Sequence, residues 1–222
     1  MSSAIQYQGR KARRAGSEQR RQAILEAALN IIVKEGIRAV RHRAVAREAD
    51  VPLSATTYYF KDISDLIADT FTLFAERALK DVIEPFKERA FALLSQFSRD
   101  SLADAEERQR LIDMMGKMMA AFIVEELNTR RGHLVAEQAF MQEAIMDSRL
   151  RELADLYLHQ QLESLMIATE LFGSSNPRLD AELILMAMMS IEQRLLVHPE
   201  KISEEFVEAR MCNLLDKLLP RG

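Results

Sequence analysis

Apolar residues recur along most of the chain at the spacing of amphipathic helices. In the first such segment, five of them follow an i, i+3, i+4, i+7, i+8 pattern, which places them on one face of an α-helix: Ile24, Ala27, Ala28, Ile31 and Ile32. Ser17 precedes this segment as a candidate N-cap, and Gly36 follows it where a left-handed C-terminal cap belongs. The pattern predicts a helix from about residue 17 to residue 35.

The same periodicity predicts further helices over the rest of the chain. A short helix is expected at 43–49 and ends before Pro52, because the residue preceding a proline disfavours helical geometry. Ser54 and Asp62 are candidate N-caps of the next two helices, and Pro85 should kink or break the path near Glu84. The remaining helices are expected at 55–60, from 63 onwards, 86–97, 106–128, 134–146, 150–172, 179–197 and 202–219. No strand alternation exceeds chance, so the fold class is all-α.

Composition adds a division of charge. The 222 residues carry a net charge of −4, but residues 1–61 hold 12 Lys+Arg and 5 Asp+Glu, whereas residues 62–222 hold 18 and 29. Such a split suggests a basic module for a polyanion attached to an acidic body. The single cysteine, Cys212, excludes an internal disulfide framework and fits a cytoplasmic protein. No apolar run is long enough to span a bilayer.

Residues 43–60 have the layout of a helix-turn-helix, with a short helix, a tight turn and a second short helix. Ala46 and Ala49 are small enough for two helices to cross closely, and Val51 suits the hydrophobic plug of the turn. The second helix, 55–60, and its cap Ser54 offer small or hydrogen-bonding side chains to a DNA groove, and Phe60 is expected to point back into the core. Basic neighbours, among them Arg43, Arg47 and Lys61, are placed to meet phosphates.

Here the sequence resembles the TetR/AcrR family of bacterial transcriptional regulators over about residues 18–78. The resemblance is carried by Lys34-Glu35-Gly36, by the run Ala44-Val45-Ala46-Arg47-Glu48-Ala49-Asp50-Val51, and by Thr57-Tyr58-Tyr59-Phe60 with Leu66 beyond. The chain departs from the family pattern in four places. A Ser or Thr often caps the second helix of the family, whereas this chain has Arg41, His42 and Arg43 there, which adds basic groups near the phosphates. Asp50 stands where the family usually has Gly, although Asp can adopt the left-handed conformation. Thr57 replaces a common aromatic residue, and Ile63 replaces a lysine that helps to hold phosphate.

The resemblance implies a DNA-binding regulator, expected to be a repressor, that binds a palindromic operator as a homodimer and is released by a small-molecule effector. It implies a three-helix DNA-binding domain with a helix-turn-helix at 17–62 and a larger helical effector-binding and dimerisation domain at 63–222. Residues 1–16 hold four basic residues and little that could be buried, so a disordered basic arm is expected there. Thr57 and Tyr59 are expected to face the groove, and Arg43, Tyr58 and Lys61 to hold the backbone. The expected DNA-binding residues are His42, Arg43, Ser54, Ala55, Thr57, Tyr58, Tyr59 and Lys61.

The effector pocket is expected between the fourth helix and the helices at 106–128 and 134–172, where the resemblance places it. Its candidate lining is largely apolar and would favour an apolar or amphipathic molecule, although an anionic ligand stays open. The candidates are Phe71, Phe74, Phe91, Met115, Met118, Phe122, Phe140 and Met166. Helices 179–197 and 202–219 carry more apolar side chains than packing in one helix layer needs. This surplus predicts that the two helices form the dimer interface.

Two other classes of protein stay open. One is a helical ligand-binding or interaction protein that does not bind DNA, and the other is an all-helical enzyme. No catalytic motif stands at a diagnostic spacing, so we expect no enzyme activity. We also expect no metal site, no cofactor and no membrane partner. His133 and His159 are more typical of ordinary surface or core histidines than of ligands.

Overall fold

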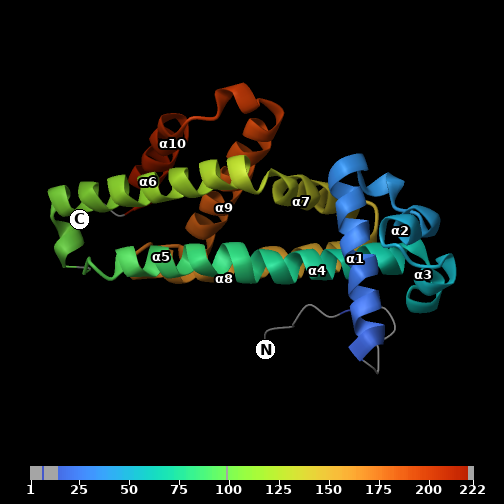
Figure 1. Cartoon of the computed structure of the whole chain (residues 1–222). Helices are drawn as coiled ribbons and strands as arrows, with labels where there is room; N and C mark the ends of the chain where they lie inside the picture. Colours follow the sequence, from blue (N-terminus) through green and yellow to red (C-terminus); the bar gives the residue numbers. More distant parts are fainter. Residues whose placement is uncertain (1–6, 8–14, 99, 220–222) are drawn as a thin grey trace. The chain divides into compact units, whose positions relative to one another are not determined.

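The structure, a computed structural model, describes residue 7 and residues 15–98 and 100–219. The described residues form helices and contain no strand, which confirms the all-α class. Figure 1 labels the α-helices, which are α1 (Ala15–Glu35), α2 (His42–Glu48), α3 (Leu53–Tyr59), α4 (Ile63–Ala78), α5 (Glu84–Leu94), α6 (Ala105–Thr129), α7 (Arg131–Ala144), α8 (Ser148–Leu171), α9 (Pro177–Val197) and α10 (Glu204–Leu218).

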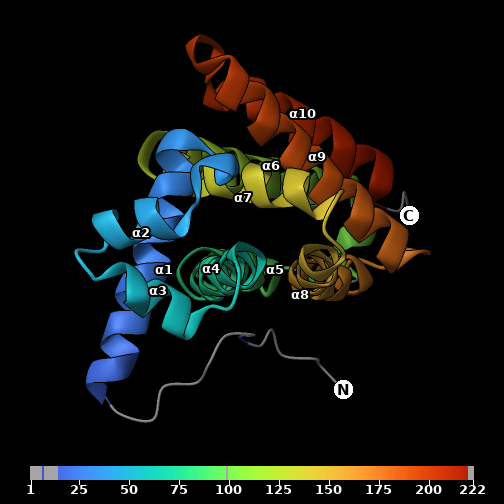
Figure 2. The same ribbon diagram turned by 90° about the vertical axis from the view of Figure 1, so that its right-hand side faces the viewer.

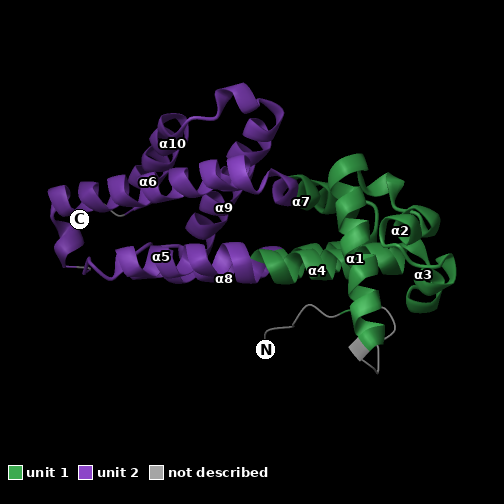
Figure 3. Ribbon diagram, in the orientation of Figure 1, with its two compact units in different colours: residues 1–78, 135–157 green, residues 79–134, 158–222 purple. Residues whose placement is uncertain are grey.

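The chain divides into two compact units, coloured separately in Figure 3. Unit 1 comprises residues 1–78 and 135–157, and unit 2 comprises residues 79–134 and 158–222. Helices α7 and α8 each run without interruption from one unit into the other. The predicted arm at 1–16 lies mostly outside the described residues, and α1 begins at Ala15, two residues before the expected Ser17.

Unit 1 contains the amino-terminal helices together with the end of α7 and the beginning of α8. Helix α1 packs against both α2 and α4, and α2 packs against α3, as Figures 1 and 2 show. The five apolar residues of the first predicted stripe are all buried, which confirms that stripe as a core face. Phe71 and Phe74 of α4 pack against Phe140 and Tyr157, with the Phe71 and Phe140 rings stacked at 4.6 Å.

A buried ion pair joins α1 to α4. Arg21 Nη2 donates to Asp69 Oδ2 at 2.6 Å, and the two side chains are 4% and 0% exposed. The guanidinium also lies over the rings of Tyr7 and Phe60. The Tyr7 hydroxyl donates to Glu76 Oε2 at 2.6 Å, which holds that residue on α4. Removing one partner of a buried pair leaves an uncompensated charge, so this contact fixes which faces of α1 and α4 meet.

Some of the helix ends have the conformations and caps that the sequence predicts. Gly36 has φ 85° and ψ 164°, so it ends α1 with a positive φ that favours glycine but not with the expected left-handed helical cap. Asp50 has φ 51° in the turn after α2. Asp62 Oδ1 accepts the Asp65 N–H at 2.8 Å, as expected of the cap of α4. The prediction that Ser54 caps α3 is wrong, because α3 begins at Leu53, two residues before the expected start at residue 55, and Pro52 occupies its N-cap position. A proline there fixes the backbone without a side-chain hydrogen bond.

The expected break near Glu84 is a change of helix type. Residues Leu79–Ile83 form a π-helical segment, and α5 follows from Glu84 with Pro85 in its first turn. Proline is tolerated there because the first turn of a helix has no internal partner for its N–H groups. The sequence therefore locates this irregularity correctly, but it does not distinguish a π-helical segment from a loop.

Unit 2 is organised around the contact of α6 with α10, with α5 and α9 also packed on α6. Gly116 lies at the closest approach, where an added Cβ would stand 2.2 Å from Cys212 Sγ. The absence of a side chain on Gly116 lets the two helices meet. Arg108 reinforces the end of α10 by binding Asp216 Oδ1 at 3.0 Å and the backbone carbonyls of Asp216 and Leu219.

Most apolar residues of α10 serve the core of unit 2. Met211 and Leu215 are buried, and Phe206, Leu214 and Leu218 pack against the same cluster. The expectation that α10 belongs to a dimer interface stays a prediction, because Phe206, Leu214 and Leu218 are only half-buried by the contacts within the chain. Within the described residues, the helices include none that is both long and apolar enough to cross a bilayer.

Candidate nucleic-acid interface and ligand cavity

The segment α2–turn–α3 has the geometry of a helix-turn-helix. Val45 and Ala46 are buried on α2, and the Val51 N–H donates to the Ala46 carbonyl at 3.0 Å, which closes the turn. Asp50 supplies the left-handed residue in that turn, at the position where the family usually has Gly. Phe60 is completely buried, which confirms that it points into the core. The turn thus positions α3 on the surface of unit 1.

Several of the expected DNA-binding residues share the solvent-exposed surface around α3. Arg43, Ser54, Thr57, Tyr58 and Lys61 are exposed, and Ala55 is half-buried. Three further basic residues are exposed on or near α2. The sequence predicts that Arg41 and Arg47 lie near phosphates, whereas it does not single out Arg38. Their side chains place positive charge next to α3, as phosphate contacts require.

Tyr59 departs from expectation. Its side chain is 5% exposed, its hydroxyl lies 2.7 Å from Ser17 Oγ, and its ring packs edge-on against Tyr58. The expectation that Tyr59 faces a DNA groove is wrong, because its ring packs into the bundle beside α1. The neighbouring Tyr58 is 54% exposed and takes the outward position.

Thr56 is also buried, although it belongs to the segment expected to face the groove. Its hydroxyl donates to the Leu53 carbonyl at 2.8 Å and lies 3.1 Å from His42 Nδ1. His42, half-buried at the start of α2, therefore contacts α3. This contact identifies a positioning role for His42 between the two helices.

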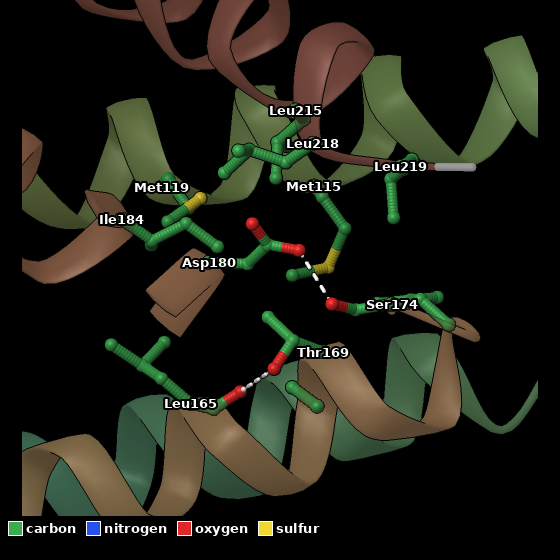
Figure 4. Close-up of a pocket in the computed structure, with 12 residues that line it drawn as sticks. Met115, Met119, Leu165, Thr169, Ser174, Asp180, Ile184, Leu215, Leu218 and Leu219 are labelled. Atoms are coloured by element: carbon green, nitrogen blue, oxygen red, sulfur yellow. Dashed lines mark hydrogen bonds between the residues drawn. The ribbon is translucent and has the colours of Figure 1, made fainter. Parts of the chain in front are cut away.

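Unit 2 contains a cavity of about 30 Å³ enclosed by side chains of α6, α8, α9 and α10 (Figure 4). Its wall is mainly apolar, with the polar groups of Thr169, Ser174 and Asp180 at one side. Ser174 Oγ donates to Asp180 Oδ2 at 2.5 Å, and Thr169 Oγ1 bonds to backbone carbonyls. The apolar wall consists of Met115, Met119, Leu165, Ala168, Phe172, Ile184, Leu215, Leu218 and Leu219.

The eight candidate effector residues are dispersed between the two units. Met115 lines the cavity. Phe91, Met118 and Phe122 belong to or border the apolar core of unit 2, and Met166 is half-buried on α8. Phe71, Phe74 and Phe140 pack together in the core of unit 1. Sequence periodicity places such side chains inward, but it does not separate a packed core from a cavity wall.

The carboxylate of Glu126 is buried in the last turn of α6. Glu126 is 1% exposed, and its Oε1 accepts a hydrogen bond from Arg130. Burial raises the pKa of the Glu126 carboxyl, against the lowering effect of Arg130. Burial, with Arg130 nearby, lowers the pKa of His133 from 6.5 to about 4. Because His133 is then neutral at pH 7, its 3.6 Å approach to Glu126 Oε2 is a polar contact and not an ion pair.

No protein-family model matches the sequence, and no curated protein matches it. Solved structures do match its fold over most of its length. A member of the TetR family from Streptomyces coelicolor A3 is 25% identical, with a TM-score of 0.59 over 91% of this chain and 99% of that chain. The multidrug binding protein EbrR, complexed with ethidium, is 24% identical, with a TM-score of 0.60 over 88% and 98%.

A third structure, a protein from Saccharomonospora viridis in complex with choline, is 16% identical with a TM-score of 0.61, over 90% of this chain and 96% of that chain. The chain therefore has the fold of the TetR-family transcriptional regulators, a family of regulators and not of enzymes. The resemblance seen in residues 18–78 is confirmed as a likeness of fold over about 90% of the chain.

The neutral state of His133 has a measurable consequence. Between pH 6.5 and 4 the unfolded chain binds more protons at this position than the folded chain. The contribution of His133 to the free energy of unfolding is therefore fully present above pH 6.5 and is lost as the pH falls toward 4. We expect the free energy of unfolding to fall by up to about 2 kcal/mol from this group between pH 7.5 and 5. His133→Gln should remove that part of the pH dependence in urea unfolding.

The control is His159→Gln, which changes an exposed histidine of α8. This variant should keep the wild-type loss of stability in acid. An unchanged acid dependence in His133→Gln would show that His133 does not carry the effect.

Proposed function

We propose that this chain is a DNA-binding transcriptional regulator, acting as a repressor, that binds a palindromic operator as a homodimer and releases it when a small molecule binds. The observation that carries the proposal is the helix-turn-helix of unit 1, with α3 exposed between basic side chains. The TetR-family fold supports it, because regulators of transcription share that fold.

In this proposal the polar face of α3 enters the major groove. Ser54, Thr57 and Tyr58 are exposed on that helix and contact bases or backbone. Arg43 and Lys61 bind phosphates on either side, which fixes the orientation of the helix on the duplex. A homodimer places two such helices about 34–36 Å apart, one turn of DNA, and therefore reads an inverted repeat.

Selection from a random pool of duplex DNA tests the regulator function directly. We expect enrichment of one palindromic sequence. Lys61→Ala should weaken binding to all DNA sequences and reduce the slope of log affinity against log salt concentration by about one unit per phosphate that Lys61 neutralises. Lys80→Ala, which removes an exposed lysine in the π-helical segment, should leave the slope unchanged.

If the pool yields no enriched sequence and the chain has no affinity for DNA, the alternative of a helical ligand-binding or interaction protein replaces this proposal. If DNA is bound but Lys61→Ala keeps the wild-type salt slope, Lys61 does not contact a phosphate.

The effector is proposed to bind in the cavity of unit 2. At about 30 Å³ the cavity is much smaller than the several hundred Å³ of ordinary ligand sites, so binding requires the lining helices to separate. Met115 and Met119 are suited to such a wall, because methionine adapts its shape readily. The almost wholly apolar wall favours an apolar or amphipathic molecule, and ethidium, bound in one of the similar structures, is a largely aromatic one.

Ethidium serves as the probe for this site. Ala168→Leu places a larger side chain at the cavity wall and should weaken ethidium binding at least tenfold, measured by fluorescence titration. Ala92→Leu makes the same change at an exposed position on α5 and should leave the affinity within twofold of wild type. Equal affinities for both variants would exclude the cavity as the effector site.

The dimer interface is proposed to lie on α9 and α10, together with the last turns of α8. Six large apolar side chains of these helices are about half or more exposed, an unusual concentration for a surface that stays in water: Ile167, Leu171, Leu179, Leu183, Met186 and Val197. Spacings of four and three residues align Leu179, Leu183 and Met186 on one face of α9. A second copy of the same face would cover this stripe by two-fold symmetry.

Light scattering at micromolar concentration checks the interface. The wild-type chain should have twice the mass of one chain, and Met186→Glu should have the mass of a monomer, because it places a charge in the apolar face. Met146→Glu is the matched control, since Met146 is 84% exposed but lies outside that face. A monomeric wild-type chain, or a Met186→Glu variant that stays dimeric, would contradict this assignment.

A further inference from the structure

Tyr7 is bound to unit 1 by two contacts of different kinds. Its hydroxyl donates to Glu76 Oε2 at 2.6 Å, and the two residues are 69 positions apart in sequence. Its ring lies over the Arg21 guanidinium, with 4.4 Å between the ring centroid and Arg21 Cζ. Arg21 belongs to α1 and Glu76 to α4. A residue that precedes α1 in the sequence therefore contacts both helices.

The hydroxyl of Tyr7 is suited to remain a hydrogen-bond donor. Burial of the side chain and the bond to Glu76 both raise the pKa of this hydroxyl. A raised pKa keeps the phenol protonated, as donation to a carboxylate requires. Hydrogen bonds to a charged acceptor are also stronger than those between neutral groups. The bond to Glu76 thereby holds the Tyr7 ring in place over α1.

The Arg21 guanidinium benefits from this ring, because hydrogen bonds do not surround it. Nη2 donates to Asp69 at 2.6 Å and Nη1 to Glu18 at 3.3 Å. The buried Nε has no hydrogen-bond partner among the described residues. The negative face of an aromatic ring attracts a cation, and more strongly where water is excluded. The Tyr7 ring supplies this attraction to a side chain that is only 4% exposed.

Arg21 in turn lies next to the residue that ends the proposed recognition helix. Its Cζ is 5.8 Å from the centroid of the Phe60 ring, which is completely buried directly after α3. The preceding residue, Tyr59, has its hydroxyl 2.7 Å from Ser17 Oγ, one turn before Arg21 on α1. The end of α3 therefore packs against the part of α1 that Tyr7 covers.

We propose that Tyr7 is a positioning residue of the DNA-binding surface, which holds the Arg21 guanidinium against Asp69 and thereby orients the end of α3. The inference rests on the proposed function, in which α3 enters the major groove. In this role Tyr7 does not contact DNA. It acts from within unit 1, through Arg21, on the side chains that support α3.

Operator binding at several salt concentrations separates positioning from direct contact with DNA. Tyr7→Ala removes both contacts of the side chain and should weaken affinity for the selected operator at least fivefold. The slope of log affinity against log salt concentration should stay at its wild-type value, because no phosphate contact is lost. Tyr7→Phe keeps the ring over Arg21 and should hold the affinity within threefold of wild type.

Phe97→Ala is the matched control. The Phe97 ring, in unit 2, also lies near an arginine, with 5.5 Å between its centroid and Arg110 Cζ. Its loss should leave the operator affinity within twofold of wild type. All variants are compared at a temperature well below their unfolding midpoints, so that the fraction of folded chain is the same.

Amide hydrogen exchange tests the positioning role without DNA. The Phe60 N–H donates to the Thr56 carbonyl at 3.0 Å and reports on the end of α3. The Gly36 N–H donates to the Ile32 carbonyl, also at 3.0 Å, and reports on the far end of α1 in the same unit. Tyr7→Ala should accelerate exchange at Phe60 at least fivefold and at Gly36 less than twofold. Tyr7→Phe and Phe97→Ala should change neither rate more than twofold.

Three results would overturn the proposal. Wild-type operator affinity in Tyr7→Ala would show that the residue does not position α3. A reduced salt slope in that variant would indicate a direct phosphate contact. Equal acceleration at Phe60 and Gly36 would mean that Tyr7 only stabilises unit 1 as a whole. A chain with no affinity for any DNA would refute the regulator function, and the two exchange rates would still decide whether Tyr7 orients the end of α3.

Discussion

The buried ion pair between Arg21 and Asp69 determines how α1 meets α4 in unit 1. Two charges that are almost fully removed from water require each other, because either one alone would be strongly destabilising in an apolar interior. The guanidinium also lies over the Phe60 ring, directly after α3. One contact thus orients the first helix, the fourth helix and the residue that ends the proposed recognition helix. The surface that we propose binds DNA therefore depends on this buried charge pair.

Much of the fold could be predicted from the sequence, because local signals coincide with it. Four such signals come from interactions within a few residues: the apolar stripe of α1, the positive φ of Gly36 and Asp50, the cap at Asp62 and the irregularity before Pro85. The exact starts of α1 and α3 could not be predicted in this way. A proline at the N-cap of α3 takes the place of the side-chain cap expected from Ser54.

The functional surface was harder to predict, because tertiary contacts decide which side of a short helix faces outward. Thr56, Thr57, Tyr58 and Tyr59 are adjacent and similar in chemistry, but two are buried and two are exposed. Nothing local distinguishes Tyr58 from Tyr59; the hydroxyl of Ser17 on α1 does. The same limit applies in unit 2, where packing buries Met211 and Leu215 of α10 and leaves the exposed stripe on α8 and α9.

The close approach at Gly116 also governs the reactivity of the one cysteine. Cys212 Sγ lies against α6, 3.7 Å from the Ile112 carbonyl, and burial with nearby carboxylates raises the pKa of the thiol. A raised pKa lowers the fraction of thiolate, the form that reacts with alkylating agents. The rate of alkylation at Cys212 is therefore sensitive to transient separation of α6 from α10. Alkylation of this native cysteine thus measures the transient separation of α6 and α10 within unit 2, and no label has to be introduced.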